Sequence, residues 1–77
     1  MRELLEYLAR ALVERPDQVA VEEFEEPDGT LVFELSVAKD DYGKVIGRGG
    51  RTAQAIRTVI KAAAVPAGKR VVVDIVE

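Results

Sequence analysis

Three glycines and two arginines lie within the five residues from Gly47 to Arg51. Gly47 and Gly50 bracket a two-residue turn, where glycine is favoured because it adopts positive φ angles without strain and lets another backbone approach closely. Downstream, apolar residues such as Ile56 and Ile60 recur at helical spacing. The glycines are therefore predicted to lie at the start of a helix.

The start of this predicted helix is suited to binding an anion. Free backbone N–H groups and the positive end of the helix dipole favour a phosphate there. Arg48 and Arg51 add full positive charges at the same place, and Lys44 and Arg57 flank it. A purely structural helix–helix turn is the alternative, but it gives no role to the basic flank. We therefore interpret the stretch as a phosphate-binding loop.

The spacing of the glycines excludes two common phosphate-binding loops. A Walker A loop has four residues between its glycines and then Lys-Ser/Thr, and the dinucleotide-binding loop follows a strand directly. Val45-Ile46-Gly47-Arg48-Gly49-Gly50 matches neither pattern. It resembles the KH-domain signature, in which Val-Ile-Gly-x-x-Gly joins two short helices and the loop clamps the backbone of about four nucleotides. The aliphatic pair and the amphipathic helix make this match more specific than the glycine loop alone.

The charged residues are distributed unevenly along the chain. Residues 1–41 hold four basic and twelve acidic side chains, whereas residues 42–73 hold seven basic and no acidic ones, within a net charge of −3. A segment of this kind is able to form a local basic surface for a polyanion. An ordinary solvated face is the alternative, because asymmetry in sequence does not guarantee clustering in space.

The composition excludes several kinds of site. The 77 residues include no cysteine and no histidine, so disulfides and the usual zinc ligand sets are absent. No acid, base or nucleophile constellation is recognisable near the loop. We therefore predict a single domain over residues 1–77 that is not an enzyme and needs no metal or cofactor. Without a leader or a membrane-spanning segment, a cytoplasmic location is expected.

The elements before the loop follow from apolar spacing. A helix is predicted over Arg2–Glu14, with a leucine stripe that is expected to be core or, alternatively, shared with a partner. Strands are predicted around Val19–Val21 and over Leu31–Ala38, and the turn chemistry of Pro27-Asp28-Gly29 predicts an antiparallel hairpin. Phe24 breaks the alternation of the first strand, which indicates a bulge or the end of regular pairing.

The loop is expected to lie between two helices and to be followed by a strand. Asp40 or Asp41 is predicted to cap a short helix that leads into the loop. Beyond the second helix, Pro66-Ala67-Gly68 breaks the pattern and Arg70–Val76 is predicted as the final strand. Because its apolar residues occupy both alternating positions, this strand is expected to be central, or covered on much of both faces.

The resulting order, α-β-β-α-α-β, resembles the type II KH arrangement over the whole chain. The fold class implied is α+β, with a three-stranded sheet covered by helices on one face. The chain looks like the small bacterial single-KH RNA-binding proteins of the KhpA type. That resemblance implies single-stranded RNA as ligand and a homodimer or a second KH-containing partner. It also implies a role as an RNA chaperone or post-transcriptional regulator linked to cell shape and division.

The resemblance also implies a set of site residues in which the loop holds phosphates and an adjacent aliphatic groove holds bases. The RNA-binding residues expected are Gly47, Arg48, Gly49, Gly50, Arg51, Lys44, Val45 and Arg57. Val37 and Ala53 are further candidates for the groove, and each of the three aliphatic residues is equally explicable as core.

Two features predict weak, unspecific binding. Tyr42 alone among the aromatic residues lies near the loop, so base stacking is expected to contribute little. Gly49 leaves Arg48 as the only charged side chain inside the turn. The alternative function is a KH-fold protein-interaction module with little RNA binding of its own.

Overall fold

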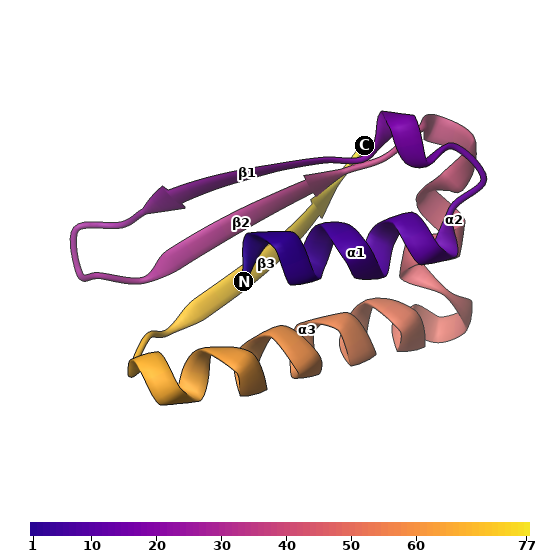
Figure 1. Cartoon of the computed structure of the whole chain (residues 1–77). Helices are drawn as coiled ribbons and strands as arrows, with labels where there is room; N and C mark the ends of the chain where they lie inside the picture. Colours follow the sequence, from indigo (N-terminus) through magenta and orange to yellow (C-terminus); the bar gives the residue numbers. More distant parts are fainter.

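The computed structural model describes all residues from 1 to 77 and has three α-helices and three strands. In chain order these are α1 (Arg2–Leu12), β1 (Ala20–Glu25), β2 (Leu31–Ser36), α2 (Tyr42–Ile46), α3 (Arg51–Ala64) and β3 (Val71–Val76). The three helices lie on one side of the sheet (Figure 1). The fold is therefore α+β with the predicted element order.

The sheet is mixed, with β2 at its centre. β1 pairs with β2 in the antiparallel direction, with Ala20 opposite Ser36. β3 pairs with β2 in the parallel direction, with Leu31 opposite Val71. The predicted antiparallel hairpin is confirmed.

The prediction that the final strand is central, or covered on much of both faces, is wrong, because β3 lies at an edge of the sheet and only one of its faces is buried. Its residues Val71, Val73 and Ile75 are buried, whereas Val72 is 44% exposed on the other face. The apolar run arises because alternate residues of β3 lie in the core while Val72, between them, lies on the uncovered face of the sheet. Strand order is decided by pairing with distant segments, which the local pattern does not specify.

Phe24 does not interrupt the pairing of β1. It lies opposite Val32, and regular pairing continues to Glu25, so neither a bulge nor an early end occurs. Val21 and Phe24 have opposite parity in the strand, and their side chains therefore lie on opposite faces of the sheet. The apolar side chain of Phe24 therefore lies on the other face of the sheet from that of Val21, although the backbone pairing stays regular.

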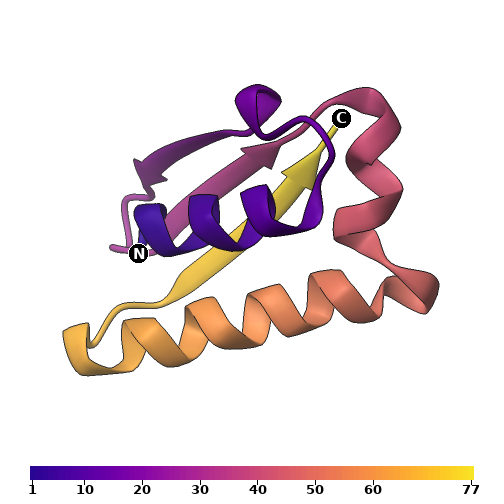
Figure 2. The same ribbon diagram turned by 45° about the vertical axis from the view of Figure 1, so that its right-hand side comes forward.

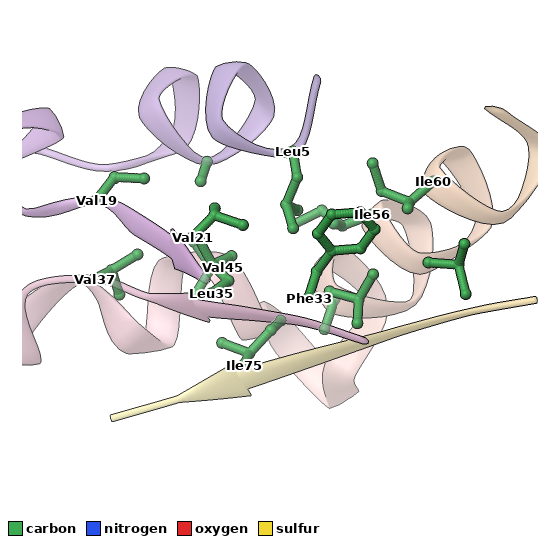
Figure 3. Close-up of a cluster of buried hydrophobic side chains, with 14 of the residues drawn as sticks. Leu5, Val19, Val21, Phe33, Leu35, Val37, Val45, Ile56, Ile60 and Ile75 are labelled. Atoms are coloured by element: carbon green, nitrogen blue, oxygen red, sulfur yellow. The ribbon is translucent and has the colours of Figure 1, made fainter. Parts of the chain in front are cut away.

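The core lies between the sheet and the helices. Fifteen buried apolar residues from all six main elements and their connections form it. Figure 3 shows a close-up of most of this cluster. Leu5 of α1, Phe33 and Leu35 of β2 and Ile60 of α3 are at most 1% exposed. Leu12, which belongs to the leucine stripe predicted to be core, is instead 40% exposed, because it lines an open groove between α1 and α3.

The connection after α1 is held by a buried carboxylate. α1 ends at Leu12, two residues before the predicted end. Asp41 is 1% exposed, and its two carboxylate oxygens accept hydrogen bonds from the backbone N–H groups of Glu14 (3.1 Å) and Arg15 (3.0 Å). Asp41 occupies the N-cap position of α2 but makes no capping bond to that helix. The expected cap is therefore corrected: this side chain fixes the end of α1 to the start of α2.

The loop between α2 and α3 lies at the opposite end of the molecule from the β1–β2 turn (Figures 1 and 2). From that loop, α3 runs back along the sheet to the turn that precedes β3 (Figure 2). At 14 residues α3 is the longest helix, and no helix has the length and apolarity that a bilayer span requires.

Candidate nucleic-acid interface

The glycine loop is a tight turn in which three of the four residues from Gly47 to Gly50 have positive φ angles. Gly47, the residue that follows α2, has φ +76°, and Gly50, immediately before α3, has φ +78°. The N–H of Gly50 donates to the carbonyl of Gly47 at 3.1 Å, which closes the turn. The positive φ angles predicted for Gly47 and Gly50 are confirmed. Gly49 also has a positive φ, +64°, which the spacing did not reveal.

Gly47 additionally permits a close approach between two backbones. A Cβ atom placed on Gly47 would lie 2.9 Å from the backbone nitrogen of Thr52 and would overlap the Thr52 side chain. The corresponding positions on Gly49 and Gly50 meet open space. The segment that comes close to the loop is therefore the first turn of α3, which sets the angle between α2 and α3.

The charged side chains of the loop are free of acidic partners. Arg48 and Arg51 are both exposed and take part in none of the four salt bridges of the structure. No side chain caps the start of α3. Two free guanidinium groups thus lie beside the positive end of a helix, an arrangement that favours phosphate.

Lys44 and Val45, expected at the site, have other contacts. The Lys44 ammonium lies 3.5 Å from a Glu14 carboxylate oxygen and 3.7 Å from one of Asp41, so its charge is partly neutralised. The side chain of Val45 is fully buried in the core, and those of Val37 and Ala53 are buried there with 8% and 2% exposure. These three aliphatic side chains therefore belong to the core and do not line an open groove.

Arg57 joins α3 to the edge strand. Its Nε–H donates to the backbone carbonyl of Val73 in β3 at 3.1 Å. Residues three or four positions apart share a helix face, so Gln54 and Lys61 lie on the same stripe as Arg57 and Arg51. Helical spacing counted from Arg51 would have identified Gln54 and Lys61, which are not among the RNA-binding residues predicted from the sequence.

The basic segment forms a strip and not a compact cluster. Its residues extend from the loop along α3, and Lys69 and Arg70 lie at the far end of the molecule. There they line a polar cavity of about 490 Å³ together with Asp28 of the β1–β2 turn. The local basic surface expected from the sequence is thus concentrated on the loop and on one flank of α3.

The opposite flank of α3 is apolar and faces α1. A shallow groove of about 250 Å³ separates the two helices there. It is lined by Leu8, Ala11, Leu12, Thr52, Ala55, Ile56 and Val59. Leu12 and Val59 are 40% and 43% exposed. One helix therefore presents a basic stripe on one side and an unfilled apolar groove on the other.

Solved structures of Era share this fold. Era of Aquifex aeolicus bound to GDP.AlF4⁻ superposes with a TM-score of 0.61 at 21% identity, over 95% of this chain. Era in complex with MgGDPNP and nucleotides 1506–1542 of 16S ribosomal RNA gives a TM-score of 0.57 at 22% identity. This chain spans 28% of the length of each Era chain.

Sequence comparison assigns the family. The relatives include the RNA-binding protein KhpA of Clostridium acetobutylicum, 55% identical over 99% of this chain and all of the relative. They also include KhpA of Halalkalibacterium halodurans, 51% identical over the full length of both, and KhpA of Chlamydia pneumoniae, 44% identical over 97% of the relative. The family model for the KH domain of KhpA and KhpB matches residues 2–75. The chain therefore belongs to the KhpA/KhpB family of KH-domain proteins.

Proposed function

We propose that this protein binds single-stranded RNA and that the loop from Gly47 to Gly50 clamps the phosphate backbone. The observation that carries the proposal is the pair of exposed, unpaired arginines, Arg48 and Arg51, at the uncapped start of α3. The names of the relatives, which describe RNA-binding proteins, support the same ligand. The family is non-enzymatic, as the sequence predicts.

The bound strand continues from the loop along the basic stripe of α3, between that helix and β3. β3 is an edge strand, and edge strands present unpaired backbone N–H and C=O groups. Those groups supply hydrogen-bond partners for the edges of unstacked bases. Arg57 holds α3 against this edge through Val73. Val45 contributes to RNA binding indirectly, because its buried side chain fixes the end of α2.

A site of this kind has low affinity and little sequence preference. Backbone amides and few charges hold the strand, and Lys44 is already engaged with Glu14 and Asp41. Phosphate contacts position a strand without reporting its sequence. We infer a role as a cytoplasmic RNA chaperone or post-transcriptional regulator that acts on many RNAs, with cell shape and division among the processes affected.

A second copy of the domain increases the effective affinity. We infer that the protein forms a homodimer or pairs with another KH-containing protein, because linking two weak sites turns the second binding event into an intramolecular one. The apolar groove between α1 and α3 offers a surface for this contact. It lies on the flank of α3 opposite Arg57, so pairing leaves the RNA path open.

The same groove favours the alternative function, a protein-interaction module that binds RNA weakly or not at all. Exposed apolar grooves rimmed by polar residues mark protein contacts in other folds. The two functions differ in what they require of the loop. An interaction module makes no use of the charge of Arg48, whereas RNA binding depends on it.

The decisive test replaces Arg48 and Gly49 together with aspartate. Both positions are exposed, so the packing cost is small, while two negative charges replace one positive charge where a phosphate must approach. Like charges at contact distance cost several kcal/mol. We expect RNA binding to be lost while the thermal unfolding followed by circular dichroism remains cooperative.

The matched control is Gly49→Asn with Arg48 left in place. Gly49 has φ +64°, and asparagine and aspartate tolerate that conformation better than other side chains, so the control carries the backbone cost without the new charge. We expect it to retain most of the RNA affinity. If the double aspartate variant folds and binds RNA like the parent, the loop is not the site and the interaction module becomes the better description.

A further inference from the structure

The face of the sheet opposite the helices is uncovered, and its residues are arranged in cross-strand rows. Phe24, Val32 and Val72 lie directly opposite one another on β1, β2 and β3. Phe24 is 46% exposed and Val72 is 44% exposed, on either side of the buried Val32. Neighbouring strands lie about 4.8 Å apart, so these three side chains form a continuous apolar row across the whole width of the sheet.

The neighbouring row is entirely acidic. Glu22 lies opposite Glu34, and Glu34 lies opposite Asp74. None of the three carboxylates takes part in a salt bridge. Like charges directly opposite one another in a sheet are destabilising. The isolated chain thus has an unfavourable row of negative charge with nothing to neutralise it.

The two rows are close enough to be contacted by one short segment. Alternate residues of a strand are about 6.6 Å apart, which is the separation between the apolar row and the acidic row. In an extended peptide, side chains two positions apart lie on the same face at the same separation. An apolar side chain and a basic side chain in an i, i+2 relation therefore match the two rows.

We propose that this open sheet face is a docking surface for a basic segment of a partner protein. The segment is extended, with an apolar or aromatic side chain over Phe24 and Val72 and a lysine or arginine two positions away that pairs with the row around Glu34. Charge complementarity selects this occupant, because the row carries three carboxylates and repels nucleic acid.

Docking on this face leaves the glycine loop accessible. The helices and Arg57 lie on the other side of the sheet, and the RNA path runs along α3. The domain thereby presents an acidic face to a protein and a basic face to RNA at the same time. A partner that itself carries basic, RNA-binding segments is held beside the RNA without competing for the loop.

A random 12-residue peptide display library, selected against the full-length protein, tests the docking surface. We expect enriched peptides to carry a lysine or arginine two positions from a large apolar residue. A synthetic peptide of the enriched sequence is expected to perturb the NMR signals of Phe24, Val32 and Val72. Its affinity is expected to fall as the salt concentration rises, because exposed charge pairs are screened.

The Glu34→Gln variant separates binding from folding. It removes the central charge of the row, so the monomer is expected to melt at a higher temperature than the parent. Peptide affinity is expected to fall about fivefold, the factor corresponding to one exposed charge pair. Affinity for single-stranded RNA is expected to stay unchanged. Glu23→Gln, an exposed carboxylate on the other face of β1, is the matched control and should leave peptide affinity at the parent value.

Three outcomes would overturn the proposal. The first is a selection that yields no basic peptides. The second is a peptide that perturbs the loop or the groove between α1 and α3 in place of the open face. The third is an unchanged peptide affinity in Glu34→Gln. Because RNA affinity is measured on the same variants, failure of the docking surface is distinguishable from failure of the RNA site.

Discussion

The loop glycines differ in the reason for which each is needed. Gly47, Gly49 and Gly50 all have positive φ angles, which side chains with a Cβ atom resist. Gly47 alone is also packed against another segment, since a Cβ there would approach the backbone nitrogen of Thr52 to 2.9 Å. A backbone atom at the start of a long helix has little room to move away.

We therefore expect Gly47→Ala to destabilise the protein more than Gly50→Ala. Gly50→Ala carries a conformational cost of about 1–2 kcal/mol in the left-handed α conformation. Gly47 (φ +76°, ψ 173°) lies in a region that is essentially restricted to glycine, and Gly47→Ala alone adds a steric conflict with Thr52. Urea denaturation of the two variants measures the difference. Equal free energies of unfolding would show that the close approach at Gly47 contributes nothing.

Asp41 couples the stability of the fold to pH. Burial raises the pKa of the Asp41 carboxyl, but hydrogen bonds from the N–H groups of Glu14 and Arg15, together with the charge of Lys44, outweigh this and hold the pKa below its usual value. A carboxyl whose pKa is lower in the folded state stabilises the fold while it is ionised. Its contribution is complete above about pH 4, the unfolded value, and is lost as the pH falls through the folded-state pKa.

The Asp41→Asn variant tests this coupling. We expect it to melt at a lower temperature than the parent at pH 7, because an amide cannot replace two charge-assisted acceptors. The difference between the two proteins should shrink progressively below about pH 4. Comparison with the parent cancels the effect of Asp28, whose pKa is also lowered, mainly by the backbone N–H of Thr30. A gap in melting temperature that is constant from pH 7 to pH 2 would contradict the assignment.

At the scale of elements, α3 has two different flanks. Arg57 lies against β3, where it hydrogen-bonds to Val73, whereas Thr52, Ala55 and Val59 face α1 across the apolar groove. The separation follows from the sequence, because basic and apolar residues recur at three- and four-residue spacing on different sides of one helix. Substitutions on the two flanks should therefore have separable effects.

Val59→Glu is expected to abolish self-association and to leave the RNA affinity per domain unchanged. Val59 is 43% exposed, so the fold tolerates the change, while a carboxylate in the groove opposes an apolar contact. Sedimentation at micromolar concentration measures the oligomeric state. Gln54→Glu, at an exposed position on the opposite flank of the same helix, serves as the control for self-association. A parent protein that sediments as a monomer at every concentration leaves only pairing with a different KH protein.

At the scale of the whole molecule, charge is separated between the two sides of the sheet. The principal extents are 34 × 21 × 17 Å, and a Debye length at physiological ionic strength is about 8 Å. The local charge of each surface, and not the net charge of −3, therefore governs what that surface attracts. An acidic protein of this kind is able to bind a polyanion on one side.

RNA affinity is accordingly expected to fall as salt increases. Each phosphate contact on a single strand contributes a slope of about −0.7 in a plot of log affinity against log salt concentration. Three or four contacts at the loop and along α3 give a slope between about −2 and −3. Titration of an unstructured oligonucleotide at several salt concentrations measures this slope. An affinity that is independent of salt would refute the electrostatic account of the RNA site.

The sequence by itself determined the features that depend on neighbouring residues. Helical spacing around α1 and α3, turn chemistry at Pro27-Asp28-Gly29 and the glycines at 47 and 50 specified the element order, the hairpin and the loop. Such features are encoded within a few residues, because steric limits on φ and ψ act locally. The match to the KH signature then predicted the fold of the whole chain.

Only the tertiary structure decided the features that depend on distant segments. The edge position of β3, the burial of Val45, the exposure of Leu12 and the hydrogen bonds of Asp41 to residues 26 and 27 positions away are of this kind. A periodic pattern tells which residues share a face, but not whether another element covers that face. The alignment of Glu22, Glu34 and Asp74 likewise required the register of three strands, and register is fixed by long-range pairing.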